Sequence, residues 1–263
     1  MIKESLILPS QGFPYNNRLE GSSVKLQPLT TRAYKDFIIS NDEEGVLNLV
    51  DSCLVDCPLK AEEFVYADVL AMYLKIRSMT LGTNITLFSV CPHCKLRNKI
   101  EWDLMSMPCK YLSVDEYPIP ITLPDSGKTI GLCLPTYKNN QVAKEEAQKR
   151  ASRYNKPITD FLSSFNTVVN LQVSGVGDLV SKAEWYENLP LRDVIYIDQA
   201  SLIIQDFGLI TSKDTVCTGC KKEYRTPFNI TQEFFRPSLG DISGFSTSQG
   251  TLQEGPSDAD SSK

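Results

Sequence analysis

The chain has 263 residues, of which 41% are hydrophobic and 22% are charged, the composition of an ordinary globular protein. Its formal net charge of -5 argues against a dedicated nucleic-acid binder, because such proteins usually carry a basic domain. No apolar stretch approaches the length of a membrane span, and we expect no signal peptide at the N-terminus. We therefore expect a reducing cytoplasm, where the eight cysteines are thiols or metal ligands rather than disulfides.

The first third of the chain has the pattern of a short strand followed by helices. A short strand is expected within 22–30, and Thr31 is a suitable cap for a helix that ends near Ile39. Apolar spacing predicts a second helix over 42–54. The strongest helical pattern covers 61–82, where acidic residues occupy the first turn and a glycine ends the apolar repeat.

Downstream of that helix the chain alternates between strand and helix patterns. Strands are expected at 84–90 and 99–104, and a β-hairpin is expected at 117–134. Ser181 and Glu184 have the spacing of a capping box at the start of a later helix. The further helices are expected over 141–154, 158–171, 181–189 and 193–207.

Two Cys-x-x-Cys motifs carry the clearest chemical signal, Cys91 with Cys94 and Cys217 with Cys220. A knuckle of this kind directs two thiolates at one metal ion about 2.3 Å away, so two knuckles complete a closed tetrahedral zinc site. With 122 residues between Cys94 and Cys217, the metal would join distant parts of the chain. The alternatives are four unliganded thiols, or a redox pair, which is disfavoured because neither motif opens a helix after a strand.

The same order of features surrounds both motifs. In each half an aspartate opens the body of a predicted helix, a glycine ends the helix, and the first cysteine follows nine residues after the glycine. We interpret the two knuckles as equivalent halves of one site, and the few matching residues also suggest a duplication. The residues are Asp68, Gly82 and Cys91 in the first half and Asp193, Gly208 and Cys217 in the second.

The other cysteines and the single histidine do not extend this site. His93 lies between two of the ligands and is expected to be exposed, since four thiolates already fill the site. Cys53 and Cys57 have a spacing that could suit a second metal, but two ligands make a poor site, so core packing is expected. Cys109 and Cys133 are isolated in the sequence.

Motifs of the common catalytic sites are missing. The sequence has no HExxH and no GxSxG, and one histidine leaves little for general base catalysis. Residues 126–129 read SGKT like the end of a P-loop, but that loop requires a glycine where Thr122 stands, and a hairpin turn explains them better. A zinc ion held by four thiolates has no open position for water. We therefore expect no enzymatic activity.

The order of several short motifs resembles the T4-type bacteriophage baseplate hub family, whose members are hub subunits or hub assembly factors of contractile phage tails. The resemblance covers about residues 7–237 and implies a tail-baseplate role with no catalytic residues to carry over. The chain departs from the family pattern at Gln11, where a basic residue is expected, and in the second knuckle, which lacks a proline. The motifs are LPSQG-x-PY at 8–15, PLTTRAYKDF at 28–37, CPHC at 91–94, NLP-x-x-D at 188–193, DFG at 206–208, CTGC at 217–220 and FFRP at 234–237.

These patterns together predict an α+β fold: a helix-rich domain with a β-hairpin and a discontinuous two-knuckle zinc ribbon. The ribbon is expected to form from about 84–103 and 211–228, within a single domain over 1–238. Residues 239–263 are rich in Gly, Ser and Asp and are expected to form a flexible acidic tail. Four apolar residues after the second knuckle are expected either to pack in the core or to form an interface. They are Phe228, Ile230, Phe234 and Phe235.

The function expected from the residues and the resemblance is a non-enzymatic structural component of the phage baseplate hub. It would be made in the host bacterial cytoplasm and reside in the virion tail, with one structural zinc ion per chain. Other hub and tail proteins are the expected partners, a homo-oligomer about the tail axis is a further expectation, and neither membrane nor nucleic acid is expected as a partner.

Two alternatives stay open. One is a transient hub assembly chaperone that is absent from the mature particle, since it would need the same interfaces. The other is a zinc-ribbon adaptor for nucleic acid or the transcription machinery, which requires a basic face beside the knuckles. The candidate residues for that face are Lys95, Arg97, Lys99, Lys221, Lys222 and Arg225.

Overall fold

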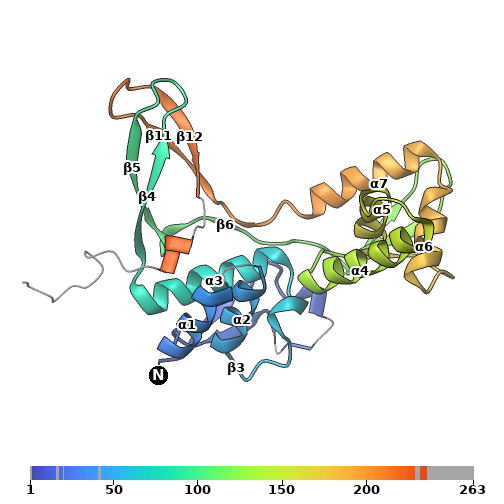
Figure 1. Cartoon of the computed structure of the whole chain (residues 1–263), viewed down its shortest axis with the longest axis horizontal. Coiled ribbons are helices and arrows are strands. Elements are labelled where there is room, and N and C mark those ends of the chain that lie inside the picture. Colours follow the sequence, from blue (N-terminus) through green and yellow to red (C-terminus); the bar gives the residue numbers. More distant parts are fainter. Residues whose placement is uncertain (1, 16–17, 20, 41–42, 229–231, 236–263) are drawn as a thin grey trace, which may run out of the picture.

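The computed structural model of the protein describes residues 2–15, 18–19, 21–40, 43–228 and 232–235. Within these residues it has seven α-helices and five small antiparallel sheets, the α+β architecture that was predicted. Figure 1 shows two helical groups at opposite ends of the molecule and two long hairpins that stand together above the first group. The predicted tail at 239–263 and Ile230 lie outside the described residues.

The helices account for most of the secondary structure. In chain order the α-helices are α1 (Thr31–Ser40), α2 (Glu43–Cys53), α3 (Tyr66–Leu81), α4 (Tyr137–Tyr154), α5 (Thr159–Val168), α6 (Leu179–Glu187) and α7 (Leu191–Ile204). The 3-10 helices are η1 (Phe13–Tyr15), η2 (Ala61–Glu63), η3 (Leu104–Ser106) and η4 (Gln232–Phe235).

The strands are short and pair only in antiparallel fashion among the described residues. The sheets are β1-β2-β3, β4-β5, β10-β6, β7-β8-β9 and β11-β12. The strands are β1 (Glu4–Ile7), β2 (Ser23–Leu26), β3 (Leu54–Val55), β4 (Asn84–Val90), β5 (Arg97–Asp103), β6 (Cys109–Lys110), β7 (Ile119–Thr122), β8 (Thr129–Leu132), β9 (Leu171–Gln172), β10 (Gly208–Leu209), β11 (Ser212–Val216) and β12 (Glu223–Pro227).

Three helix starts differ from the sequence-based prediction. The pattern over 61–82 is interrupted, because the backbone is extended at Val65 and the long helix α3 begins only after it. Helix α4 begins four residues earlier than predicted, where the Thr136 hydroxyl accepts a hydrogen bond from the backbone at 3.1 Å. The predicted capping box was wrong: Asp178 is the N-cap of α6, and Ser181 donates to it through both its backbone N–H and its hydroxyl.

The order of elements repeats once along the chain. The first unit (residues 4–103) and the second unit (residues 119–227) each begin with a β-hairpin and continue with two helices. Each then adds a third strand, giving the matching sheet orders β1-β2-β3 and β7-β8-β9. After a further short helix comes a long helix, α3 or α7, then a glycine and a hairpin with one Cys-x-x-Cys motif. The duplication suggested by the cysteine regions therefore extends through the whole topology.

The register of the strands supports this equivalence. When the strand pair β1–β2 is aligned with the strand pair β7–β8 residue by residue, Leu26 corresponds to Leu132. The same alignment places LPSQG at 8–12 opposite LPDSG at 123–127. The backbone N–H that follows each matched leucine donates to the carbonyl just before the third strand of its sheet. These bonds run from Gln27 to Cys53 (2.9 Å) and from Cys133 to Asn170 (2.8 Å).

A buried aspartate ties each long helix to the hairpin turn of its own unit. Asp68 in the first turn of α3 accepts a hydrogen bond from the backbone N–H of Ser10 at 2.9 Å. Asp193 in the first turn of α7 accepts bonds from the backbone N–H groups of Asp125 and Ser126 at 2.8 and 3.0 Å. The aspartates that marked the repeat in the sequence thus perform the same structural task in both units.

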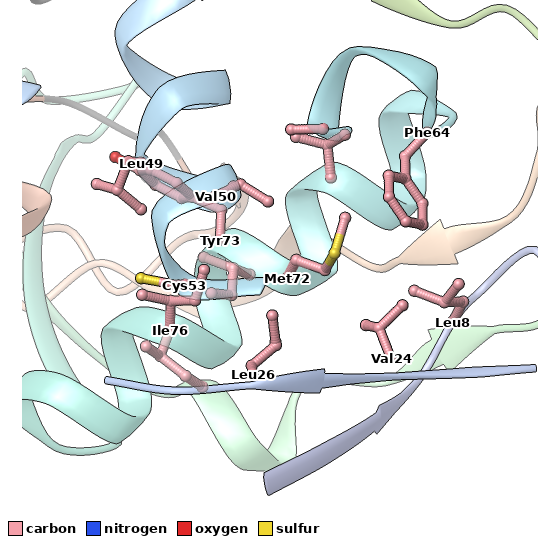
Figure 2. Packing of buried hydrophobic residues seen from close by; sticks show 14 of the residues in the cluster. Leu8, Val24, Leu26, Leu49, Val50, Cys53, Phe64, Met72, Tyr73 and Ile76 are labelled. Atoms are coloured by element: carbon pink, nitrogen blue, oxygen red, sulfur yellow. The ribbon is translucent and has the colours of Figure 1, made fainter. Parts of the chain in front are cut away.

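Each unit has its own hydrophobic core. In the first unit, Val24 and Leu26 on β2 point toward α3 (Figure 2). Cys53 is buried in this core, as predicted, and Cys57 packs against it. Burial of each large aliphatic side chain contributes about 1.5–3 kcal/mol. The labelled residues of Figure 2 are Leu8, Val24, Leu26, Leu49, Val50, Cys53, Phe64, Met72, Tyr73 and Ile76. The second core includes Leu123, Ile130, Leu132, Phe165, Val168 and Ile197.

The aromatic residues after the second knuckle belong to the first core. Phe234 stacks on Tyr73 of α3 with ring centroids 5.4 Å apart, and Phe228 meets Trp102 edge-on at 5.0 Å. Phe235 is also buried. Core packing is therefore the correct alternative for these three phenylalanines, and the end of the described chain closes over its beginning.

Candidate metal centre

Two β-hairpins bring the four predicted ligands together. Cys91 and Cys94 lie in the turn between β4 and β5, and Cys217 and Cys220 lie in the turn between β11 and β12. The hairpins stand side by side with their turns together (Figure 1), and all four sulfur atoms lie within 4.8 Å of one another. The Sγ–Sγ separation is 3.5 Å between Cys94 and Cys217 and 3.8 Å between Cys91 and Cys220.

The two turns have the same backbone geometry. The N–H of the first cysteine bonds to the carbonyl five residues later, at 2.9 Å in the first turn and 3.0 Å in the second. The carbonyl of the first cysteine accepts from Lys95 in one turn and from Lys221 in the other, at 3.0 and 3.1 Å. These two lysines have left-handed φ angles of 62° and 60°. This repetition places both pairs of sulfurs in equivalent positions.

Asn98 connects the two hairpins beneath the sulfurs. Its side chain is buried, its Oδ1 accepts the backbone N–H and the hydroxyl of Thr218 at 2.9 Å each, and its Nδ2 donates to the Cys217 sulfur at 3.6 Å. The glycine at 219 allows the second turn to lie against Leu96 of the first turn, because a Cβ at this position would be 2.8 Å from a methyl carbon of Leu96. Its Nδ2 also donates to the Leu96 carbonyl of its own turn at 3.1 Å, so this buried amide bonds to both turns and acts as a positioning residue for the cluster.

The crowded thiols differ in acidity. The backbone N–H of Cys220, helped by that of Gly219 and by the Cys94 and Asn98 side chains, lowers the pKa of Cys217 to about 6. The N–H of Lys222 favours the Cys220 thiolate, but burial and the neighbouring sulfurs outweigh it and raise the pKa of Cys220 to about 11. Four sulfurs this close repel one another as thiolates, so full ionisation requires a cation among them.

The spacing of the sulfurs matches a metal site better than a disulfide. A tetrahedron with metal–sulfur bonds of about 2.3 Å has edges of about 3.8 Å, close to the two separations above, whereas a disulfide bond is about 2.05 Å long. All four cysteines are free of disulfides. Four thiolates suit zinc or iron, and four protein ligands leave no position for a reacting water.

The other residues considered from the sequence lie away from the cluster or take no part in it. His93 lies in the first turn with its side chain exposed. Cys53 and Cys57 are in the first core region, and Cys133 follows β8 in the second unit. The SGKT residues form the turn and first position of the β7–β8 hairpin, as predicted, rather than a phosphate loop before a helix.

Sequence reasoning missed Asn98, the residue that links the turns. Its only local signal is the alternation of β5, in which Asn98, Ile100 and Trp102 are buried between exposed neighbours. The equivalent positions of β12 are Tyr224 and Thr226, followed by Phe228, and all three are buried. An asparagine at the first of these positions could have been recognised as unusual, because a buried amide needs partners.

The basic residues beside the turns do not form a uniformly basic face. The Arg97 guanidinium lies over the Phe88 ring at 4.0 Å, and Lys99 pairs with Glu101 at 3.0 Å. Asp214 and Glu223 are exposed on the second hairpin. The six candidates of the adaptor hypothesis, all exposed, are Lys95, Arg97, Lys99, Lys221, Lys222 and Arg225.

The comparisons with known proteins agree with the resemblance seen in the sequence. None of the described helices has both the length and the apolar character that a bilayer crossing demands. None of the curated proteins and none of the solved structures compared with the chain matches it. The model of one family, described as T4 bacteriophage base plate protein, matches residues 5–236. The chain therefore belongs to the T4 bacteriophage base plate protein family, which implies a structural role in the virion tail among other tail proteins.

Proposed function

We propose that the chain is a non-enzymatic structural component of the baseplate hub, stabilised by one zinc ion bound to Cys91, Cys94, Cys217 and Cys220. The observation that carries the metal proposal is the four-sulfur cluster, in which two of the sulfur–sulfur separations are close to the edge length of a tetrahedral site. The family match over residues 5–236 supports the baseplate role.

The role of the zinc ion would be to join the two units. Its ligands come from hairpins at the ends of the two units, so the ion closes a loop of 122 residues between Cys94 and Cys217. The described residues within 1–238 would then act as one domain, because the ribbon formed by 84–103 and 211–228 would connect the two units. Four thiolates complete the coordination, and this closed site supports a structural rather than a catalytic role.

Contacts with neighbouring hub proteins are supported by an exposed apolar face on α7. Leu191, Leu202 and Ile203 are 73%, 72% and 74% exposed, and Ile195 lies on the same helix at 47%. Large apolar side chains gathered on one helix of a soluble protein mark an interaction surface. We infer that α7 contacts another protein of the baseplate hub.

Metal analysis tests the first part of the proposal. Protein purified without chelator is expected to contain about one zinc ion per chain. A preparation that is folded by circular dichroism and contains no zinc would contradict it, and iron in place of zinc would correct the identity of the ion.

Mass spectrometry of purified phage particles, beside lysate of infected cells, tests the second part. We expect the chain in particles at a fixed stoichiometry with other hub proteins. Abundance in lysate with absence from particles would instead establish the assembly chaperone. Leu202→Asp, which places a negative charge on the exposed apolar face of α7, should lower incorporation, whereas the matched substitution Ile39→Asp at an exposed position of α1 should not.

A further inference from the structure

The outer edge of strand β1 is open. In its antiparallel pairing with β2, the Leu8 N–H donates to Ser22 O at 2.8 Å, so Leu8, Leu6 and Glu4 direct their backbone groups inward. The alternate residues Ser5 and Ile7 therefore direct their N–H and C=O groups outward. Within the described residues no strand pairs with this outer edge, since β1 is the first strand of the sheet β1-β2-β3.

An apolar groove of about 340 Å³ runs beside this edge. Its lining includes Ala71 and Leu74 of α3, Met105 of η3, and Met107, which lies between η3 and β6. Methionine side chains adapt to many apolar shapes, as a binding surface requires. The groove is closed at Pro9, where the backbone carbonyl that follows β1 already accepts a hydrogen bond from the Leu112 N–H at 2.8 Å.

The groove is also electrically neutral. Among the described residues that line it, Lys75 is the single charged one, and its ammonium group pairs with the Glu4 carboxylate. A charged side chain entering the groove would lose water without gaining a free partner. The lining therefore favours an uncharged, apolar occupant.

The second unit protects the equivalent edge. Strand β7 matches β1 in register, and Pro120 opposite Gly131 takes the place that Ser5 takes opposite Lys25. Proline has no N–H, and it is a common device for preventing an edge strand from pairing with another chain. A second proline, Pro118, precedes the same strand. The first unit has no proline in β1, and its open edge is the one that lies beside the groove.

We propose that the groove binds an extended, uncharged apolar segment of another baseplate protein, which adds as a strand to the outer edge of β1. This inference rests on the proposed function for the class of partner. The outward groups of Ser5 and Ile7 would bond to the backbone of the segment, and alternate side chains of the segment would enter the groove between α3 and the two methionines. The closed end at Pro9 limits how far the segment extends.

The test compares Ser5→Pro with Ser5→Ala in the full chain. The proline variant copies the second unit and removes one outward N–H, whereas the alanine variant keeps it and removes only the hydroxyl. The probe is an array of overlapping synthetic peptides that cover the other tail and baseplate proteins of the same phage, together with peptides from 236–263 of this chain. Affinity for each captured peptide is then measured by fluorescence anisotropy.

We expect wild type and Ser5→Ala to bind the same uncharged apolar peptide with equal affinity, and Ser5→Pro to bind it about tenfold more weakly. Met105→Lys, which places a charge on the rim without touching β1, should also weaken binding about tenfold. Circular dichroism melting of each variant verifies that it is folded.

Four outcomes would overturn the proposal. Capture of no peptide by wild type, or equal affinity in all four proteins, would exclude the groove as a binding site for such a segment. Capture only of peptides from 236–263 would make the occupant the chain itself. A dimer in sedimentation that Ser5→Pro dissociates would make the occupant a second copy. Each of these results leaves the particle analysis unaffected, so the baseplate role stands or fails separately.

Discussion

The two units place an aspartate at the same point, but the pKa values of the two carboxyl groups are shifted in opposite directions. Burial dominates at Asp68 and raises its pKa to about 6, although the Ser10 and Tyr15 hydroxyls and the Ser10 N–H bond to it. Burial also opposes ionisation of Asp193, but hydrogen bonds from Ser126 and Asp125 and the nearby Arg192 lower its pKa below the usual value. Equivalent positions in a duplicated topology therefore need not keep equivalent chemistry.

The long helices of the two units differ as much as their aspartates. Helix α3 has eight buried residues and is covered by η3, η4 and β10, whereas α7 has two buried residues and exposes several large apolar ones. The reason lies in where the hairpins stand: both rise above the first unit and leave the outer face of α7 uncovered (Figure 1). A helix sequence thus becomes core or surface according to what packs on it.

The largest effect is expected from breaking the joint between the units. Cys217→Ser removes one of the four proposed metal ligands and should lower the melting temperature by more than about 10 °C, because the proposed ion would hold both units. Cys57→Ser, a thiol outside the cluster, is the control and should change it by only a few degrees. Equal melting curves for wild type and Cys217→Ser, measured by calorimetry with zinc present, would show that the cluster is not a structural joint.

The next effect is a dependence of stability on pH. The unfolded Asp68 carboxyl loses its proton near pH 4, while the folded one keeps it to about pH 6, so the folded state binds more protons between these values. Stability should therefore fall by about 3 kcal/mol as pH rises from about 4 to about 6. Urea unfolding at several pH values measures it, and Asp68→Asn should abolish this fall.

Asp193 should behave in the opposite sense. Because its folded pKa is depressed, the stability that it contributes is present above about pH 4 and is lost as pH falls through the lower folded value. A stability profile that Asp193→Asn leaves unchanged at acid pH would refute the contrast between the two units.

At pH 7 the two asparagine variants should differ. Asp193→Asn replaces one of the two carboxylate oxygens that accept from backbone N–H groups, and these backbone groups cannot rotate to find another acceptor. The substitution should therefore lower the melting temperature by about 5 °C. Asp68→Asn should be milder, because it removes a buried charge and the hydroxyls of Ser10 and Tyr15 can rotate to accept from the amide. If thermal melting ranks the two variants the other way, burial is not the dominant influence on Asp68.

The smallest effect concerns the glycines that follow the long helices: Gly82 is the C-cap of α3, whereas Gly208 opens β10, four residues after α7 ends and not at the helix end that was predicted. Gly82 and Gly208 have φ angles of 92° and 110°, which strain any other residue by about 1 kcal/mol. A Cβ at Gly208 would also lie 3.0 Å from the Ala67 Cβ, whereas one at Gly82 meets nothing within 4 Å. Gly208→Ala should therefore destabilise more than Gly82→Ala in chemical denaturation, and equal losses would mean that the contact with Ala67 is easily relaxed.

The sequence by itself determined the local features of this protein. Helical periodicity located the bodies of all seven described helices, and the Cys-x-x-Cys spacing identified the four residues that meet. Both signals lie within a few residues of chain, where backbone geometry alone relates spacing to position. The predicted cap of α6 was wrong because both Asp178 and Ser181 are suitable capping residues near the start of the helix. Only the folded structure shows that Asp178 is the cap.

Only the tertiary structure decided what lies between distant residues. The match of LPSQG at 8–12 with LPDSG at 123–127 emerged from strand register, and the role of Asn98 from its contacts with a turn 120 residues away. The stacking of Phe234 on Tyr73 likewise joins the end of the described chain to helix α3 of the first unit. Such contacts depend on which surfaces meet after folding, and no local spacing records that, because burial is a property of the whole packed molecule.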